Sequence, residues 1–110
     1  MAIKYLRKYV TPSSGVETTL YTVPEANNSV VSSLRVTNTY TAATLLTVTV
    51  YPEGGATPYL LLLDYSLNTD QTMDVFSGVP CVMQAGDVLK VTANTADVDF
   101  YMSYMEMDRT

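Results

Sequence analysis

Few side chains in this chain are suited to catalysis. Its 110 residues include no histidine and a single cysteine, Cys81. Acid–base chemistry would therefore depend on carboxylates, tyrosines or Lys90. Cys81 lies among strand-forming residues, and no histidine is present to deprotonate its thiol, so we expect a buried, inert thiol rather than a nucleophile. One cysteine also excludes a disulfide within the chain and a cysteine-based zinc cluster. The sequence predicts a protein that is not an enzyme.

The carboxylates offer one pair with a suggestive spacing. Asp97 and Asp99 are two residues apart, so on a strand they would share a face and could approach one cation. Calcium takes roughly six to eight oxygen ligands, more than this pair supplies. We therefore interpret both, together with Asp70 and Asp74, as solvated side chains. A glycosidase-like carboxylate pair would need a sugar cleft, and no aromatic platform is evident. No catalytic residue, metal site or cofactor is predicted.

Any such residues would have to be positioned by strands. Apolar and polar residues alternate over residues 30–37 and 46–51, with Val30, Leu34 and Val36 on the apolar side of the first segment. A period of two is typical of half-buried strands. The polar residues 38–43 between them predict a β-hairpin over residues 29–55, with one apolar face that a second layer must cover. Residues 88–92 and 98–107 predict a second hairpin.

Turn signals recur about every ten residues, as in all-β sandwiches. We predict one domain, an antiparallel β-sandwich of about eight strands, jelly-roll-like or Ig-like, over residues 16–110. Residues 1–15 are predicted to form an N-terminal arm, or a first strand and a turn. Residues 59–67, YLLLLDYSL, are apolar without alternation. That segment fits a strand buried on both faces, or a strand whose outer face meets another subunit.

The charge distribution is uneven. The net charge is −5, which argues against nucleic acid as a partner, yet three of the six basic residues lie in the first eight positions. These residues could dock on an acidic protein, including a second copy, or could lie on a solvated first strand. No segment has the ~20 apolar residues of a membrane helix, and no apolar leader is evident, so we expect synthesis in a cytoplasm without membrane insertion.

Tyrosine is unusually frequent, with nine copies against two phenylalanines and no tryptophan. Tyrosine suits subunit contacts because it covers apolar area and keeps a hydrated hydroxyl, although ordinary strand propensity also favours it. The methionines near the C-terminus are open to the same two interpretations, subunit contact or ordinary packing in a strand. The residues that we predict to form interfaces are Lys4, Tyr5, Arg7, Lys8, Tyr40, Tyr51, Tyr59, Tyr65, Tyr101 and Met105.

Several segments carry a family resemblance. They are TLYTVP at 19–24, VVSSLRVTN at 30–38, YLL at 59–61 and QAGDVLKVTA at 84–93. In these the chain resembles the small β-sandwich virion proteins of tailed bacteriophages, over roughly residues 16–107. The resemblance implies a non-enzymatic structural role with many copies, as capsid decoration (cement) proteins or as parts of necks, tails and fibres. It carries over no functional residue.

These observations lead to one expected function. We expect a capsid decoration protein of the virion, made in the host bacterial cytoplasm, that binds the outside of the particle through its N-terminal arm and outer sheet faces. The expected partners are the major capsid protein or other virion proteins and copies of the chain itself, as a trimer or higher oligomer. The alternatives are a neck, tail, baseplate or fibre component, and a free carbohydrate-binding module, against which the absence of tryptophan counts.

Overall fold

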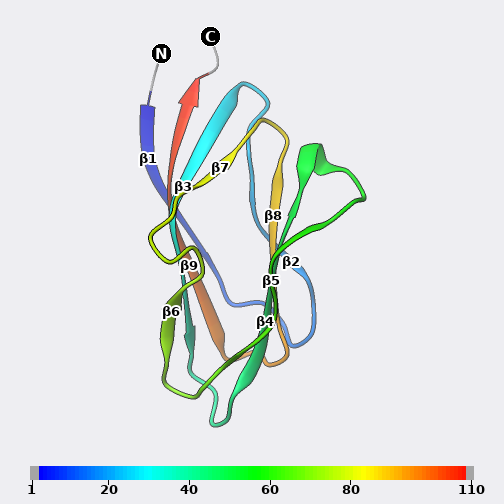
Figure 1. Ribbon diagram of the computed structural model, residues 1–110, viewed down its shortest axis with the longest axis vertical. Helices are drawn as coiled ribbons and strands as arrows, with labels where there is room; N and C mark the ends of the chain where they lie inside the picture. Colours follow the sequence, from blue (N-terminus) through cyan, green and yellow to red (C-terminus); the bar gives the residue numbers. More distant parts are fainter. Residues whose placement is uncertain (1–2, 109–110) are drawn as a thin grey trace.

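The structure is a computed structural model that describes residues 3–108, and it consists of strands packed in two layers (Figure 1). Met1 and Ala2 of the predicted N-terminal segment, and the last two residues of the predicted sandwich domain, lie outside the described residues. The strands are β1 (Ile3–Val10), β2 (Thr18–Thr22), β3 (Asn27–Asn38), β4 (Thr44–Tyr51), β5 (Tyr59–Leu67), β6 (Thr72–Asp74), β7 (Cys81–Met83), β8 (Val88–Ala93) and β9 (Val98–Asp108). The predicted all-β antiparallel sandwich is confirmed.

Helical structure is confined to a short 3-10 turn, η1 (Pro52–Gly54), within the described part of the chain. It begins the proline- and glycine-marked connection between β4 and β5. Glu53 in this turn has a left-handed backbone, with φ of 56°. Over residues 3–108, no helix has the length and apolarity to cross a membrane.

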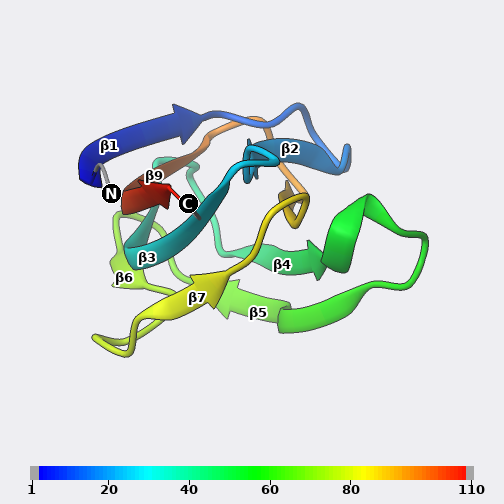
Figure 2. The same cartoon turned by 90° about the horizontal axis from the view of Figure 1, so that it is seen from above.

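The two sheets contain strands from both halves of the chain. Sheet A has the order β1-β9-β3-β6, with β7 also paired to β3, and sheet B has the order β2-β8-β4-β5. Figure 2 shows the two layers side by side, with β1 and β2 at one side of the sandwich and β5 and β7 at the other. One set of pairings is nested: β4 with β5, β3 with β6 and β7, β2 with β8, and β1 with β9. Two further pairings, β3 with β9 and β4 with β8, complete the sheets. The chain is thus one long hairpin rolled into two layers.

Both predicted hairpins are wrong, although their strands are present. β3 belongs to sheet A and β4 to sheet B, and likewise β8 and β9 lie in different sheets. The short connections after β3 and after β8 therefore cross from one layer to the other. Each strand presents one apolar face, and two such faces stacked across a sandwich exclude water from both. Alternation shows which side chains point inward, but it does not show which strand is the hydrogen-bonded neighbour.

The core face of β3 changes phase in its first half. Val31, Leu34 and Val36 are fully buried, whereas Val30 is only half-buried and points outward, against expectation. The pairing of β3 with β9 shifts between Val31 and Ser33, which marks a β-bulge. A bulge adds one residue to one strand and so exchanges the inward and outward positions on either side of it.

The core is built from side chains of both sheets. The residues of its buried cluster are Leu20, Tyr21, Val23, Val31, Leu34, Val36, Leu46, Val48, Leu67, Met83, Leu89, Val91, Ala93, Val98, Phe100, Met102 and Tyr104. The predicted shared face of β9 is confirmed, since Val98, Phe100, Met102 and Tyr104 all lie in this cluster.

A polar network ties the two sheets together at the end near the chain termini. The Tyr21 hydroxyl on β2 donates a hydrogen bond to Glu106 Oε2 on β9, at 2.5 Å, and lies 2.5 Å from Ser29 Oγ on β3. The Tyr21 ring packs on Tyr104, with ring centroids 4.4 Å apart. Burial of the hydroxyl, and secondly its hydrogen bond to the Glu106 carboxylate, raise the pKa of Tyr21 far above its ordinary value of 10.0.

This network should make stability fall at alkaline pH. The folded state holds the Tyr21 proton more tightly than the unfolded state, so the stabilisation is complete below the unfolded pKa and is lost as pH rises toward the folded pKa. We expect the free energy of unfolding to decline above about pH 10, at up to ~1.4 kcal/mol per pH unit from this group. Urea titrations between about pH 8 and pH 11 measure it. Tyr21→Phe should be less stable at neutral pH but should decline less steeply. An unchanged slope in Tyr21→Phe would contradict this assignment.

Candidate interaction surfaces

The acidic side chains of the described residues are spread over turns and strand ends. Across residues 3–108, no three or more His, Cys, Asp or Glu side chains gather where they could hold a metal ion. Asp99 accepts a hydrogen bond from Thr11 Oγ1 at 2.7 Å, and the Asp97 carbonyl accepts one from Thr39. Asp74 accepts from the backbone N–H groups of Leu34 and Phe76. These aspartates therefore organise turns and strand ends.

Cys81 is half-buried rather than fully buried, at the start of β7 and packed against the core. Burial, and secondly the negative charge of Asp87, raise the pKa of its thiol. The thiolate is the nucleophilic form of cysteine. The environment of Cys81 therefore disfavours nucleophilic reactivity.

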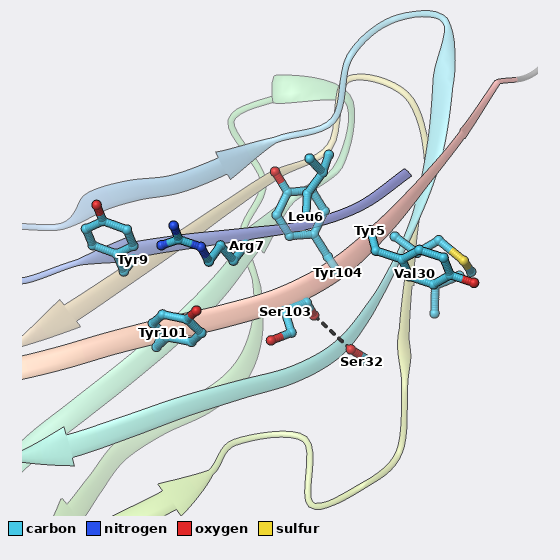
Figure 3. A pocket seen from close by; sticks show the side chains of 10 residues that line it. Tyr5, Leu6, Arg7, Tyr9, Val30, Ser32, Tyr101, Ser103 and Tyr104 are labelled. Carbon is cyan, nitrogen blue, oxygen red and sulfur yellow. Dashed lines mark hydrogen bonds between the residues drawn. The ribbon is translucent and has the colours of Figure 1, made fainter. Parts of the chain in front are cut away.

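The first candidate surface is a shallow groove of about 790 Å³ on the outer face of sheet A, over β1, β9 and β3 (Figure 3). We call it the tyrosine groove. Its lining residues are Tyr5, Leu6, Arg7, Tyr9, Val30, Ser32, Tyr101, Ser103, Tyr104 and Met105.

Strand register explains why apolar side chains meet in the tyrosine groove. Tyr5 on β1 is opposite Met105 on β9, and Met105 is opposite Val30 on β3. Val30 is in turn opposite Val82 on β7, which is also exposed. Directly paired residues lie on the same face of a sheet. An apolar row therefore crosses four strands on the solvent side, and the outward position of Val30 at the bulge completes it.

The other end of the tyrosine groove is aromatic and cationic. Tyr9 stacks on Tyr101 with ring centroids 6.2 Å apart and an interplanar angle of 9°. The Arg7 guanidinium lies 5.7 Å from the centroid of the Tyr9 ring. Ser32 Oγ donates to the Ser103 carbonyl at 3.0 Å, as Figure 3 shows between the two strands. Within residues 3–108, Arg7 makes no ion pair, so its charge is available to a partner.

The predicted basic segment is an edge strand of the sheet. β1 pairs with β9 along its whole length, from Ile3 opposite Met107 to Val10 opposite Phe100. Tyr5 and Arg7 share the outer face, whereas Lys4 and Lys8 point to the other face. Charged side chains, especially lysine, protect edge strands from unwanted pairing. β1 is therefore a positively charged edge.

The second candidate surface is β5, the edge strand of sheet B, which we call the leucine edge. Its exposed large apolar side chains are Tyr59, Leu60, Leu61, Leu63 and Tyr65. The first three are consecutive, so both faces of the strand are uncovered there. Of the two interpretations of this segment, burial on both faces within the chain is wrong. Contact of β5 with another subunit stays a prediction.

Irregular pairing sets the geometry of the leucine edge. The register between β4 and β5 shifts on both sides of Val48, which indicates bulges. Asp64 has a left-handed backbone with φ of 46°, and its N–H donates to Thr47 Oγ1 at 3.2 Å. Asp64 is the only charged residue in β5. β5 therefore lacks the lysine and proline that protect many edge strands.

The predicted interface residues divide among several places. Tyr5, Arg7, Tyr101 and Met105 line the tyrosine groove, while Tyr59 and Tyr65 belong to the leucine edge. Lys4 and Lys8 lie on the opposite face of β1, and Tyr40 lies in the exposed connection after β3. Tyr51 is on sheet B, where its hydroxyl donates to both Glu17 carboxylate oxygens at 3.0 Å and Lys90 Nζ lies 4.6 Å from its ring centroid.

Sequence reasoning did not name the exposed leucines Leu60, Leu61 and Leu63, or Tyr9 and Val82. For the leucines a signal was present, because an aliphatic run without alternation cannot be a strand with one wet face. For Val82 no signal was available, since its exposure depends on the neighbours of a three-residue strand.

Comparison with known proteins identifies solved structures with a similar fold. No family model matches the chain, and no curated protein is significantly similar to it. A chain of the T13 viral particle of infectious bursal disease virus aligns with 96% of this chain and 31% of its own length, at 12% identity and a TM-score of 0.59. A chain of the VP2 subviral particle of the same virus aligns with 97% of this chain and 32% of its own, at 15% identity and a TM-score of 0.54.

A pentameric capsid protein isolated from metagenomic phage sequences also aligns, at 21% identity over 94% of this chain and 61% of its own, but its TM-score of 0.44 is too low to establish a common fold. This chain spans about a third of the length of the viral-particle chains that it matches. At such identities the likeness shows a shared β-sandwich fold.

Proposed function

We propose that this chain is a non-enzymatic structural protein of a bacteriophage virion, and that its specific role is to decorate the outer surface of the capsid. One observation carries the proposal: the edge strands β1 and β5 expose large apolar side chains, with Tyr5 83% and Leu63 62% exposed. Contiguous exposed apolar surface on a folded domain is typical of an interaction site. Function then lies in surface that the chain offers to neighbouring proteins.

The fold supports this proposal. We interpret the nested strand pairing as a jelly roll, in which one long hairpin is rolled into two sheets, and viral capsid domains commonly use that fold. The viral-particle chains with the same sandwich add to the support. Lectins and cupins also use jelly rolls, so the fold by itself does not assign a role. The resemblance of the sequence to phage virion proteins favours the structural one.

The charge distribution supports a protein partner. The basic edge β1 belongs to a chain whose net charge is −5, and its cations have no ion pairs within residues 3–108. Such an edge is suited to an acidic patch on the major capsid protein or on another virion protein. The tyrosine groove beside it supplies apolar area for the same contact.

Binding to particles tests the proposal. Labelled protein is mixed with undecorated phage heads, and with complete virions, and co-sedimentation and cryo-electron microscopy locate it. Decoration gives many regularly arranged copies on the head surface. Binding only at the neck, tail or baseplate would assign the chain to the alternative virion class. Failure to bind either particle, with a saturable increase in melting temperature on adding a glycan, would favour a carbohydrate-binding module instead.

Charge reversal on β1 gives a sharper result. In Lys4→Glu/Arg7→Glu/Lys8→Glu, the positive edge becomes negative, so attraction to an acidic partner becomes repulsion. We expect the affinity for the particle to fall at least about tenfold at physiological salt, which corresponds to about 1.4 kcal/mol. Titration with labelled protein measures the affinity. Lys90→Glu reverses a charge on sheet B and should leave it unchanged. If particle attachment survives the triple change, docking through β1 is wrong and β1 is a solvated strand.

A further inference from the structure

The chain carries two unlike apolar surfaces, and they complement each other. We infer that copies of this chain bind head to tail, with the leucine edge (β5) of one copy seated against the tyrosine groove of the next. The inference rests on the proposed function, a virion protein that acts through its surfaces, and it names a second copy as the partner of these two surfaces.

The shapes of the two surfaces are complementary. The leucine edge is an uncovered strand whose consecutive apolar side chains project on both faces. The tyrosine groove is hollow, with about 790 Å³ of open volume lined mainly by tyrosine, methionine, leucine and valine. Branched aliphatic side chains fit against aromatic and methionine side chains, which adapt to irregular shapes. Each surface can therefore cover apolar area that the other leaves exposed.

Charge distinguishes this contact from the symmetric ones. The first eight residues carry three basic groups and no acidic group, while the remaining residues carry three basic and eleven acidic groups, a net of −8. Asp64, the only charge in β5, would lie close to the Arg7 guanidinium, the cation that lines the groove. A β5–β5 contact would instead bring two Asp64 carboxylates together, and a β1–β1 contact would bring together the cations of both copies. Like charges at an interface are unfavourable, so the heterologous contact is preferred.

The position of the two surfaces permits repetition. β1 ends sheet A on one side of the sandwich, and β5 ends sheet B on the other side (Figure 2). One head-to-tail contact therefore leaves a free leucine edge at one end of the pair and a free groove at the other. Heterologous contacts of this kind continue until they close a ring or form a filament.

Two variants, each with one surface removed, test the inference. Leu61→Glu/Leu63→Glu places charge on the leucine edge, and Tyr5→Ala/Arg7→Glu removes an aromatic ring and the cation from the groove. Wild-type protein should form oligomers larger than dimers within concentrations up to ~1 mM. Each variant alone should associate at least about a hundredfold more weakly. Light scattering after size exclusion and sedimentation velocity measure both. Circular dichroism and melting curves establish that each variant is folded.

Mixing the two variants is the decisive measurement. The intact leucine edge of one should bind the intact groove of the other, which gives a one-to-one dimer with no surface left for growth. We expect its affinity to lie within about threefold of the wild-type contact. As a control, Val79→Glu adds a charge at a 69% exposed position in the connection before β7 and should leave assembly unchanged.

The remaining outcomes overturn the inference in identifiable ways. A groove variant that still dimerises alone would show a symmetric β5–β5 contact, and a mixture that stays monomeric would show that the two surfaces do not meet. Wild-type protein that is monomeric throughout, yet binds phage heads, would refute the head-to-tail contact and leave the proposed function standing. Oligomers that bind neither heads nor complete virions would support the head-to-tail contact and refute the proposed function.

Discussion

Replacing Phe100 with alanine is expected to lower the free energy of unfolding by about 3–5 kcal/mol. Phe100 is only 1% exposed, and among the described residues it is the largest of the fully buried side chains. It lies on β9, which pairs with both β1 and β3, so the surrounding backbone is held on two sides and cannot collapse into the space. The variant therefore loses the transfer energy of the ring and keeps a cavity.

Urea denaturation followed by far-ultraviolet circular dichroism measures this loss. Domains of this size have total stabilities of roughly 5–15 kcal/mol, so Phe100→Ala should unfold at much lower urea concentration. The neighbouring Tyr101→Ala is the matched control, because its side chain is 42% exposed on the outer face of the same strand. Its cost should stay within about 1 kcal/mol. Equal losses in the two variants would mean that β9 does not present its faces as the structure shows.

Replacing Asn38 with alanine is expected to cost about 2–4 kcal/mol, although no apolar contact is the cause. Asn38 ends β3 and is 0% exposed. Its Nδ2 donates to the carbonyls of Ala42, at 3.0 Å, and Leu67, at 2.9 Å, and its Oδ1 accepts from the Tyr40 N–H at 2.9 Å. Alanine would leave these backbone groups without their partner at the point where the chain crosses from sheet A to sheet B.

The aspartate variant tests the two hydrogen bonds donated by the Asn38 side chain separately from the one that it accepts. Asn38→Asp retains an oxygen for the Tyr40 N–H but faces two carbonyl oxygens with a buried carboxylate, so it should be at least as unstable as Asn38→Ala. Thr41→Ala, in the same connection and exposed, should change stability by no more than about 0.5 kcal/mol. Equilibrium urea unfolding compares the three. A mild effect of Asn38→Ala would show that water replaces the amide, and that the crossing does not depend on this side chain.

The accuracy of the sequence-based predictions depended on how local each property is. The strands at 30–37, 46–51 and 98–107 were predictable because side-chain alternation follows from the backbone of each strand. Their partners were not, because β3 and β4 lie in different sheets and each pairs with strands from elsewhere in the chain. Val30 was misplaced for a related reason: the bulge near Ser32 exists in the pairing with β9, a strand about seventy residues away in sequence.

The candidate surfaces also depend on strand pairing that the local sequence does not show. Tyr5, Tyr101 and Met105 were predicted as separate interface residues, and only the register of β1 with β9 brings them into one groove. Tyr51 was predicted on the same compositional grounds, yet it hydrogen-bonds to Glu17 within the chain.

Three properties could be derived without a structure: the protein is all-β, it has no histidine for acid–base chemistry, and its basic residues are concentrated near the start of the chain. These properties depend on composition and on neighbours a few residues away. Three other properties became visible in the folded chain: β1 and β5 are edges, the run of leucines in β5 is exposed, and a groove lies over β1 and β9. Whether a strand has one neighbour or two, and whether its face is covered, depends on segments distant in sequence, and the strand's own residues do not encode it.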